Sequence, residues 1–110
     1  MPIFITQGRY TDHALKGMIA NPENRAKAVG DLFERAGGKL LAFYMTFGEY
    51  DWISIAEMPD HRSDLAVVIA GASNGAVTNV RTMVAVTPEE FMQACGDAAK
   101  LAPTFKVAGG

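Results

Sequence analysis

The chain has 110 residues, a formal net charge of −2 at pH 7 and a hydrophobic content of 49%. This length corresponds to one ordinary domain. The charges are spread along the chain, which argues against nucleic-acid binding because that function requires a clustered basic face. The longest apolar run, residues 65–72, is far shorter than the roughly 20 residues that span a bilayer, so we expect no membrane segment.

The cysteine content and the N-terminal sequence bear on the cellular compartment. Cys95 is the only cysteine, so an internal disulfide is excluded and a reducing cytoplasm is favoured. The first residues lack a basic region followed by an apolar stretch and a small-residue cleavage site, so we expect no secretory leader. The sequence therefore predicts a cytoplasmic protein. A high apolar content without a membrane segment also indicates that another subunit covers part of the surface.

Hydrophobic periodicity and capping residues predict strands and helices along the whole chain. In chain order, we expect a strand over 3–10, a short helix capped by Thr11 or Asp12, a helix over 22–36 capped by Asn21, strands over 39–47 and 52–58, a helix over 62–72 that is buried on more than one side, a strand over 77–86 and a helix after Thr87. The last helix starts with the capping-box sequence TPEE at 87–90. Its inner side is expected to consist of Phe91, Ala94, Cys95 and Ala98.

The resulting order is β-α-β-β-α-β with an added C-terminal helix. Two right-handed crossovers around a central hairpin predict an α+β, ferredoxin-like fold with a four-stranded antiparallel sheet and helices on one face. Both sides of the strand over 39–47 are largely apolar: one side is expected to carry Leu41, Phe43, Met45 and Phe47, and the other Leu40, Ala42 and Tyr44. A sheet with one wet face is polar on that side. We therefore predict that two sheets pack face to face in a dimeric α/β barrel, with residues 1–100 as the domain and 101–110 as a C-terminal tail.

The sequence contains no standard catalytic, metal or cofactor motif, so it predicts neither a metal site nor a cofactor. His13 and His61 have no second ligand at metal-binding spacing. We expect both to be exposed beside aspartates that cap helices, and the alternative is a histidine that acts as a base at the barrel mouth. Cys95 is expected to be a buried small hydrophobe rather than a reactive thiol, because no basic neighbour lowers its pKa.

Polar side chains within apolar strands are the remaining candidates for a site. They are Thr6, Gln7, Tyr44, Thr46, Ser54, Asn79, Arg81 and Thr82. Arg81 either occupies an exposed edge position or is buried against Asp51, Glu57 or an anionic ligand. In the hairpin sequence TFGEYDW, Gly48 is explained by a turn with positive φ. Asp51 either accepts backbone amides of this turn or contacts a ligand, while Tyr50 needs a surface on which to pack.

Four stretches together resemble the GYD domain family of small bacterial proteins: FITQGRYT at 4–11, FYMTFGEYDWISIAEMPD at 43–60, NVRT at 79–82 and TPEEF at 87–91. The resemblance runs along nearly the whole chain except for the extension beyond Ala99. It implies the dimeric α/β-barrel superfamily and no settled activity. A similar Gly-x-Tyr-Asp hairpin occurs in the effector-binding domains of feast/famine transcription regulators. That second resemblance implies an amino-acid site between subunits, carried here by Gly48, Tyr50 and Asp51, without a helix-turn-helix for DNA.

Three functions agree with these features. The leading hypothesis is a homodimeric domain that binds a small metabolite between the sheet and the helices. Its candidate ligand-binding residues are Tyr44, Gly48, Tyr50, Asp51 and Arg81. The second is a cofactor-free oxygenase or isomerase, with Asp51, His13 or His61 as the proton acceptor and Tyr44 or Tyr50 as the donor. The third is an interaction module whose apolar surface serves assembly alone, with oligomers larger than a dimer formed through the helix over 62–72 or the tail. No residue is assigned as catalytic.

Overall fold

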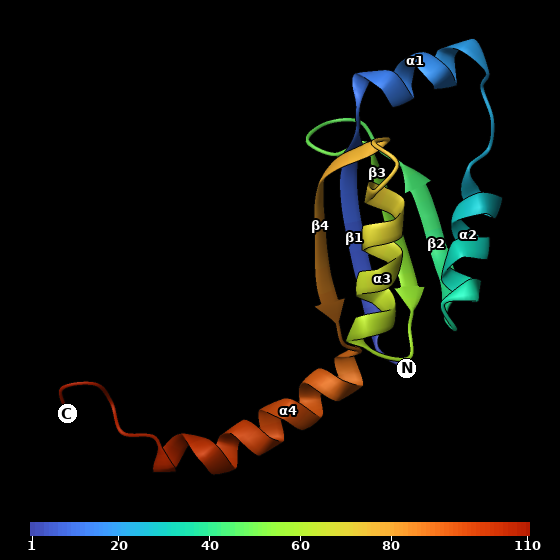
Figure 1. The fold of residues 1–110 in the computed structure, drawn as a ribbon. Coiled ribbons are helices and arrows are strands. Elements are labelled where there is room, and N and C mark those ends of the chain that lie inside the picture. Colours follow the sequence, from blue (N-terminus) through green and yellow to red (C-terminus); the bar gives the residue numbers. More distant parts are fainter.

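The computed structural model describes the whole chain, residues 1–110. Its elements, in chain order, are β1 (Ile3–Tyr10), α1 (Asp12–Ala20), α2 (Ala26–Arg35), β2 (Lys39–Met45), β3 (Trp52–Glu57), α3 (His61–Ala72), β4 (Val77–Ala85), α4 (Pro88–Leu101) and a final 3-10 turn (Ala102–Thr104). The strands form one antiparallel sheet in the order β2-β3-β1-β4 (Figure 1). The predicted α+β class with a four-stranded antiparallel sheet is therefore confirmed, and its order is that of a ferredoxin-like fold. None of the helices is long and apolar enough to span a bilayer.

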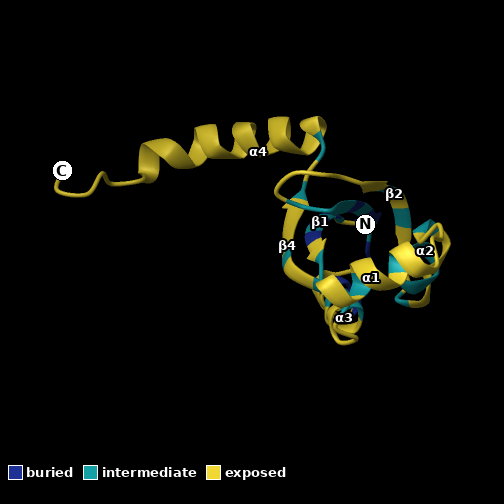
Figure 2. Cartoon of the chain, turned by 90° about the horizontal axis from the view of Figure 1, so that it is seen from above, coloured by how far each residue is buried: buried dark blue, intermediate teal, exposed yellow.

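One side of the sheet faces the helices and forms the core. We call this side the helix face; its central residues are Phe4, Thr6, Trp52, Ser54 and Ala56. Phe4 lies opposite Ala56 and Thr6 opposite Ser54, so these alternate residues point the same way. Phe33 of α2 and Val67 of α3 pack on Phe4, Ala56 and Met58 to complete the buried cluster. Figures 1 and 2 show α2 and α3 beside this face and α1 across its upper end.

The other side of the sheet carries no packed helix from α1 to α3 (Figure 2). We call it the open face; its central residues are Ile5, Tyr44, Ile53, Ile55 and Met83. Ile5 lies between Ile55 and Met83 on the neighbouring strands, and Tyr44 lies opposite Ile53. Tyr44 is 64% exposed and Met83 52% exposed. The sheet is thus apolar on both faces.

Strand β2 departs from simple alternation. Its register with β3 shifts between Leu40 and Ala42, so one extra residue interrupts the ladder. Leu40 consequently packs against the core, and Phe43 lies opposite Ser54 on the same helix face. The prediction that Leu40 and Phe43 point to opposite sides is therefore wrong, because a uniform period of two residues has no place for a bulge.

Two helix predictions also need correction. The second helix, α2, begins at Ala26 rather than at Pro22, because Asn21 closes the preceding helix α1 instead of capping α2. The third helix, α3, buries only Asp64 and Val67, so it is covered on one side rather than on several. Leu65 and Ile69 of this helix remain exposed because no further layer of the chain lies over it.

Helix α4 extends away from the rest of the domain (Figure 1). Its start agrees with the prediction, since the Thr87 hydroxyl accepts a hydrogen bond from the Glu90 N–H at 3.1 Å. Every residue from 88 to 110 is exposed, however. The expected inward packing of α4 and the expected burial of Cys95 are therefore wrong for the single chain. The Cα radius of gyration is 18.1 Å, whereas a compact chain of this length has about 13 Å.

Candidate functional site

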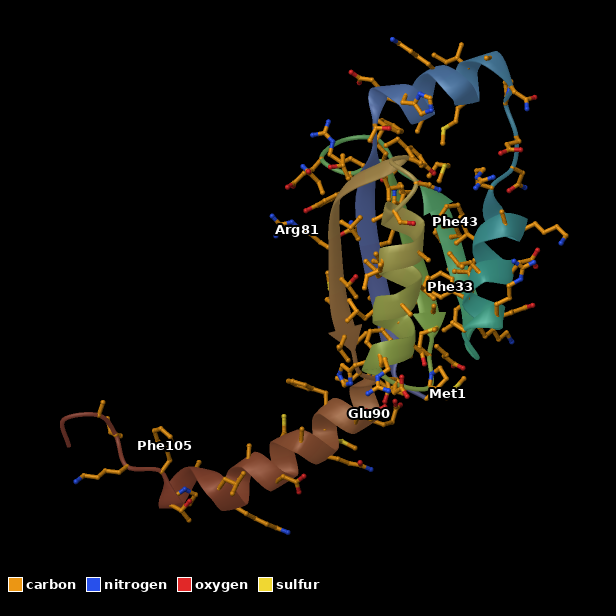
Figure 3. All side chains as sticks on the ribbon, in the orientation of Figure 1. Met1, Phe33, Phe43, Arg81, Glu90 and Phe105 are labelled. Atoms are coloured by element: carbon orange, nitrogen blue, oxygen red, sulfur yellow. The ribbon has the colours of Figure 1, made fainter.

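A cavity of about 490 Å³ lies between the helix face and helices α1, α2 and α3. Hydrophobic side chains make up 15 of its 23 lining residues. Figure 3 shows two of them, Phe33 of α2 and Phe43 of β2, in the space between α2 and the sheet. The volume lies within the range of roughly 300–1,000 Å³ that is typical of small-molecule sites.

Small residues on the helices create this space. Gly17 on α1 and Gly71 on α3 both line the cavity, and a Cβ added at either would meet nothing within 4 Å. Ala14, Ala28 and Ala70 line the same region. Since short side chains cannot bridge the gap between the helices and the sheet, the interior stays open instead of closing into a dense core.

The floor of the cavity carries hydroxyl groups on the helix face. Ser54 is 3% exposed and lines the cavity. Thr6 and Thr82 share a hydrogen bond between their hydroxyl oxygens at 3.0 Å. Burial raises the pKa of the Tyr10 phenol, and the Asp51 carboxylate adds to this effect while Arg25 opposes it. Tyr10 is therefore a neutral hydroxyl at physiological pH, and the floor offers uncharged donors.

Trp52 forms part of the cavity wall beside this floor. Its indole ring lies across Gly8 of β1 so closely that no Cβ would fit there. The indole Nε1–H is buried and has no hydrogen-bond partner. Trp52 is also the only tryptophan of the chain, so its fluorescence reports on the cavity wall.

The charged residues of the cavity wall are confined to its mouth. They are Glu23 and Arg25, which pair at 2.8 Å in the segment between α1 and α2. Both side chains are about half exposed, so this pair contributes little stability. The interior thus lacks a charge that would balance a buried ionic group.

The hairpin loop between β2 and β3 attaches to the end of β1 through Asp51. One Asp51 carboxylate oxygen accepts the Tyr10 backbone N–H at 2.8 Å, and the Asp51 N–H donates to the Gly8 carbonyl at 2.9 Å. The loop is closed by the Thr46 N–H, which donates to the Asp51 carbonyl at 2.8 Å. Gly48 has φ +138°, as expected for a turn glycine. Asp51 therefore accepts a backbone amide, but this amide belongs to β1, so the prediction that Asp51 accepts amides of its own turn is wrong.

The structure does not bring the predicted ligand-binding residues together at the cavity. Tyr44 lies on the open face, and Gly48 and Asp51 lie in the hairpin loop. Tyr50 and Arg81 share a second, polar hollow of about 450 Å³ with Arg9, Glu49, Asn79 and Val80. Arg81 is exposed on the edge strand β4 and makes no ion pair (Figure 3), in agreement with the first of its two interpretations.

The three proton acceptors considered for an enzyme also lie outside the cavity. His13 and His61 are exposed, and neither they nor Asp51 belong to the cavity wall. Asp60 caps α3 by accepting the Ser63 N–H at 2.8 Å, and the same hydrogen bonding lowers the pKa of its carboxyl. The interpretation of His61 as an exposed neighbour of a capping aspartate is therefore confirmed. At the first helix Thr11, not Asp12, is the cap.

Known proteins share the sequence pattern of this chain. The GYD domain pattern matches residues 4–95. A Thermus thermophilus protein named "Glutamine synthetase and cystathionine beta-lyase binding protein" is 33% identical over 78 residues, which cover 70% of this chain and 81% of that protein. This chain belongs to the GYD domain family. In this GYD domain, Asp51 of the Gly-Glu-Tyr-Asp segment fastens the hairpin loop to the strand that carries Tyr10.

Two solved structures resemble the GYD domain at low sequence identity. The crystal structure of FFRP-DM1 is 18% identical, with a TM-score of 0.45, and the match covers 78% of this chain and 100% of that one. The crystal structure of TTHA0845 from Thermus thermophilus is 15% identical, with a TM-score of 0.45, and the match covers 79% of this chain and 95% of that one.

The residues of the cavity floor had a partial signal in the sequence. Thr6 and Ser54 stood out as polar residues in apolar strands, and the structure pairs them across β1 and β3. Tyr10 and Trp52 carried no such signal, because an aromatic residue at a strand end is equally compatible with an ordinary core. Gly17 and Gly71 gave no signal either, since a glycine within a helix does not by itself predict a cavity beside that helix.

Proposed function

We propose that this GYD domain binds an apolar small molecule in the cavity between the helix face and helices α1 to α3, and that it acts as a homodimer joined through the open face. The observation that carries the ligand proposal is the 490 Å³ cavity with its mostly apolar wall. The Ser54 and Tyr10 hydroxyls favour a ligand with one uncharged polar group. A buried ionic group is disfavoured, because the interior has no charge to pair with it.

The dimer proposal draws its support from the open face. Ile5, Ile53, Ile55 and Met83 form a continuous apolar surface across three strands. An exposed apolar sheet face of this kind is stabilised when a second sheet packs on it. In a two-fold symmetric dimer, the open face of each copy would pack on the open face of the other.

A cavity-filling substitution tests the ligand proposal. The neutral fluorescent probe N-phenyl-1-naphthylamine is titrated into the protein, and energy transfer from Trp52 reports binding beside the cavity wall. Gly71→Leu fills the cavity without a backbone clash, because position 71 faces open space. We expect this variant to weaken probe binding by about tenfold, equivalent to about 1.4 kcal/mol of lost apolar contact.

The matched control is Gly96→Leu, which makes the same change in helix α4, away from the cavity. We expect probe binding to this variant to equal that of the wild type. Absence of saturable probe binding in the wild type, or equal binding by Gly71→Leu, would contradict a ligand site in this cavity.

A second candidate function is the binding of another enzyme, as the name of the Thermus thermophilus relative states for that protein. The exposed apolar surfaces of the chain also support a role in assembly. Purified glutamine synthetase and cystathionine beta-lyase are passed over the immobilised GYD domain, with serum albumin as the control. Saturable binding of either enzyme, without binding of albumin, supports this function. Equal signals for all three proteins count against it.

A further inference from the structure

The chain exposes far more surface than a protein of its size. Its accessible surface is 7990 Å², whereas a folded monomer of 11.8 kDa exposes about 5,900 Å². The excess of about 2,000 Å² per chain is larger than the roughly 800 Å² that each partner contributes to a standard interface. Such an excess is typical of a subunit of a permanent dimer that has been separated from its partner.

Much of this surface belongs to residues 88–110, which we call the arm. The arm contains α4 and the following turn, and α4 packs on no other part of the chain. Phe91 is 62% exposed, Leu101 65% and Phe105 78%. Phe91, Ala94, Cys95 and Ala98 follow one another at helical spacing, so they form one apolar side of α4.

A helix like α4 needs a surface to pack on. It has 14 residues, and isolated helices of about 12–15 residues are marginal in water even with favourable sequences. Gly96 in its interior weakens it further. The apolar side of α4 provides the means of stabilisation, but its own domain does not cover that side.

The direction of the arm places it on the same side of the domain as the open face. Figure 2 shows α4 on the side of the sheet opposite α1 and α3, where it runs out past β4. The arm and the open face therefore lie on the same side of the domain. A second copy that covers the open face would also lie within reach of the arm.

We propose that two copies of this chain exchange their arms, so that each α4 packs through Phe91, Cys95 and Ala98 on the other copy. This inference rests on the proposed homodimer and adds a second contact to it. The face-to-face pairing covers the open face and the exchange covers the apolar side of α4, and together they account for the large exposed surface of the single chain.

Cys95 is a native probe of the exchange, because it is the only cysteine and lies on the apolar side of α4. Sedimentation velocity first gives the concentrations at which the full chain is a dimer and a monomer. The rate of Cys95 labelling by a fluorescent maleimide is then measured at both. We expect labelling to be slower in the dimer by about an order of magnitude, because the thiol reacts only when the arm opens.

Three outcomes overturn the exchange, and they separate it from the proposed dimer. A dimer whose Cys95 reacts as fast as in the urea-unfolded chain retains the face-to-face pairing but excludes the exchanged arm. A chain that stays monomeric at all concentrations excludes both proposals. Protection of Cys95 that persists in the dilute monomer shows that the arm folds back on its own domain.

A pair of variants on α4 completes the test. Phe91→Glu places a charge on the apolar side of the helix, and we expect it to weaken dimerisation by about tenfold and to expose Cys95. Gln93→Glu introduces the same side chain on the opposite side of α4 and is expected to dimerise like the wild type. Circular dichroism verifies that both variants keep their strands. Equal dimer affinity of the two variants overturns the proposal.

Discussion

Replacing Gly8 by alanine should destabilise the domain through the indole ring of Trp52. Gly8 of β1 lies opposite Trp52 of β3, and the ring lies across the glycine on the helix face. A Cβ at position 8 would lie 2.9 Å from Trp52 Cε2 and closer still to Cζ2. The strand cannot easily retreat, because the Gly8 carbonyl accepts the Asp51 N–H at 2.9 Å. The ring must therefore move toward the cavity.

The size of the effect follows from two opposing contributions. Overpacking of a well-packed site destabilises a protein by about 1–3 kcal/mol. The lower chain entropy of unfolded alanine opposes this by about 0.4–1 kcal/mol. From the middle of each range the net loss is about 1.3 kcal/mol, which lowers Tm by about 5–10 °C in a domain of this size.

Thermal unfolding followed by circular dichroism measures the loss, and Trp52 emission reports the displaced ring. Gly71→Ala is the matched control, since it adds the same methyl group in open space on α3. It should stabilise the domain by up to about 1 kcal/mol, because alanine favours the helix over glycine. The two substitutions thus have opposite predicted signs.

A double-mutant cycle decides whether Trp52 is the cause. In a Trp52→Leu background the ring is absent, and Gly8→Ala should cost close to nothing. The reasoning is refuted if Gly8→Ala melts like the wild type with unchanged emission. It is also refuted if the loss persists in full without the indole ring.

Four further substitutions test the loop attachment, the buried Asp64 of α3 and the Asp60 cap of that helix. Asp51→Ala removes the acceptor of the Tyr10 N–H and should lower the unfolding free energy in urea by about 1–3 kcal/mol, whereas Asp51→Asn keeps an acceptor and should lose less. Burial raises the pKa of the Asp64 carboxyl above its value in the unfolded chain. The wild type therefore loses stability as the pH rises through the range between the pKa of Asp64 in the unfolded chain and its pKa in the folded chain. Asp64→Asn should therefore melt higher than the wild type at pH 7, with a smaller difference in acid. Hydrogen bonds from Ser63 lower the pKa of Asp60, so Asp60→Ala should lower Tm at pH 7, and the difference should vanish as pH falls through the folded pKa.

Element positions were predictable where the signal is local. Thr87 caps α4 as expected, because a cap acts on an amide only three residues away. The start of α2 was not predictable in this way. Asn21 can end one helix or begin the next, and in the structure its N–H donates to the Gly17 carbonyl of α1 at 2.9 Å, so it ends the first. The bulge after Leu40 likewise depends on pairing with β3 rather than on the sequence of β2.

The candidate site was predictable only in part. Polar residues within apolar strands pointed to Thr6 and Ser54, which lie on the cavity floor. Tyr44 and Arg81 belonged to the same set, yet they lie on the open face and at the sheet edge. The strand pattern distinguishes two faces but does not say which of them the helices cover.

The sequence by itself determined the family, the order of strands and helices, and the apolar character of both sheet faces. The family follows from the motif stretches shared with the GYD pattern. The element order and the apolar faces follow from side-chain periodicity and from caps, which act over a few neighbouring residues. The tertiary structure decided that Asp51 holds the amide of Tyr10, 41 residues away, and that small residues on α1 and α3 leave a cavity above the sheet. The tertiary structure also shows that α4 extends away from its own domain. Contacts between distant segments depend on how whole elements pack, and no local pattern in the chain encodes that packing.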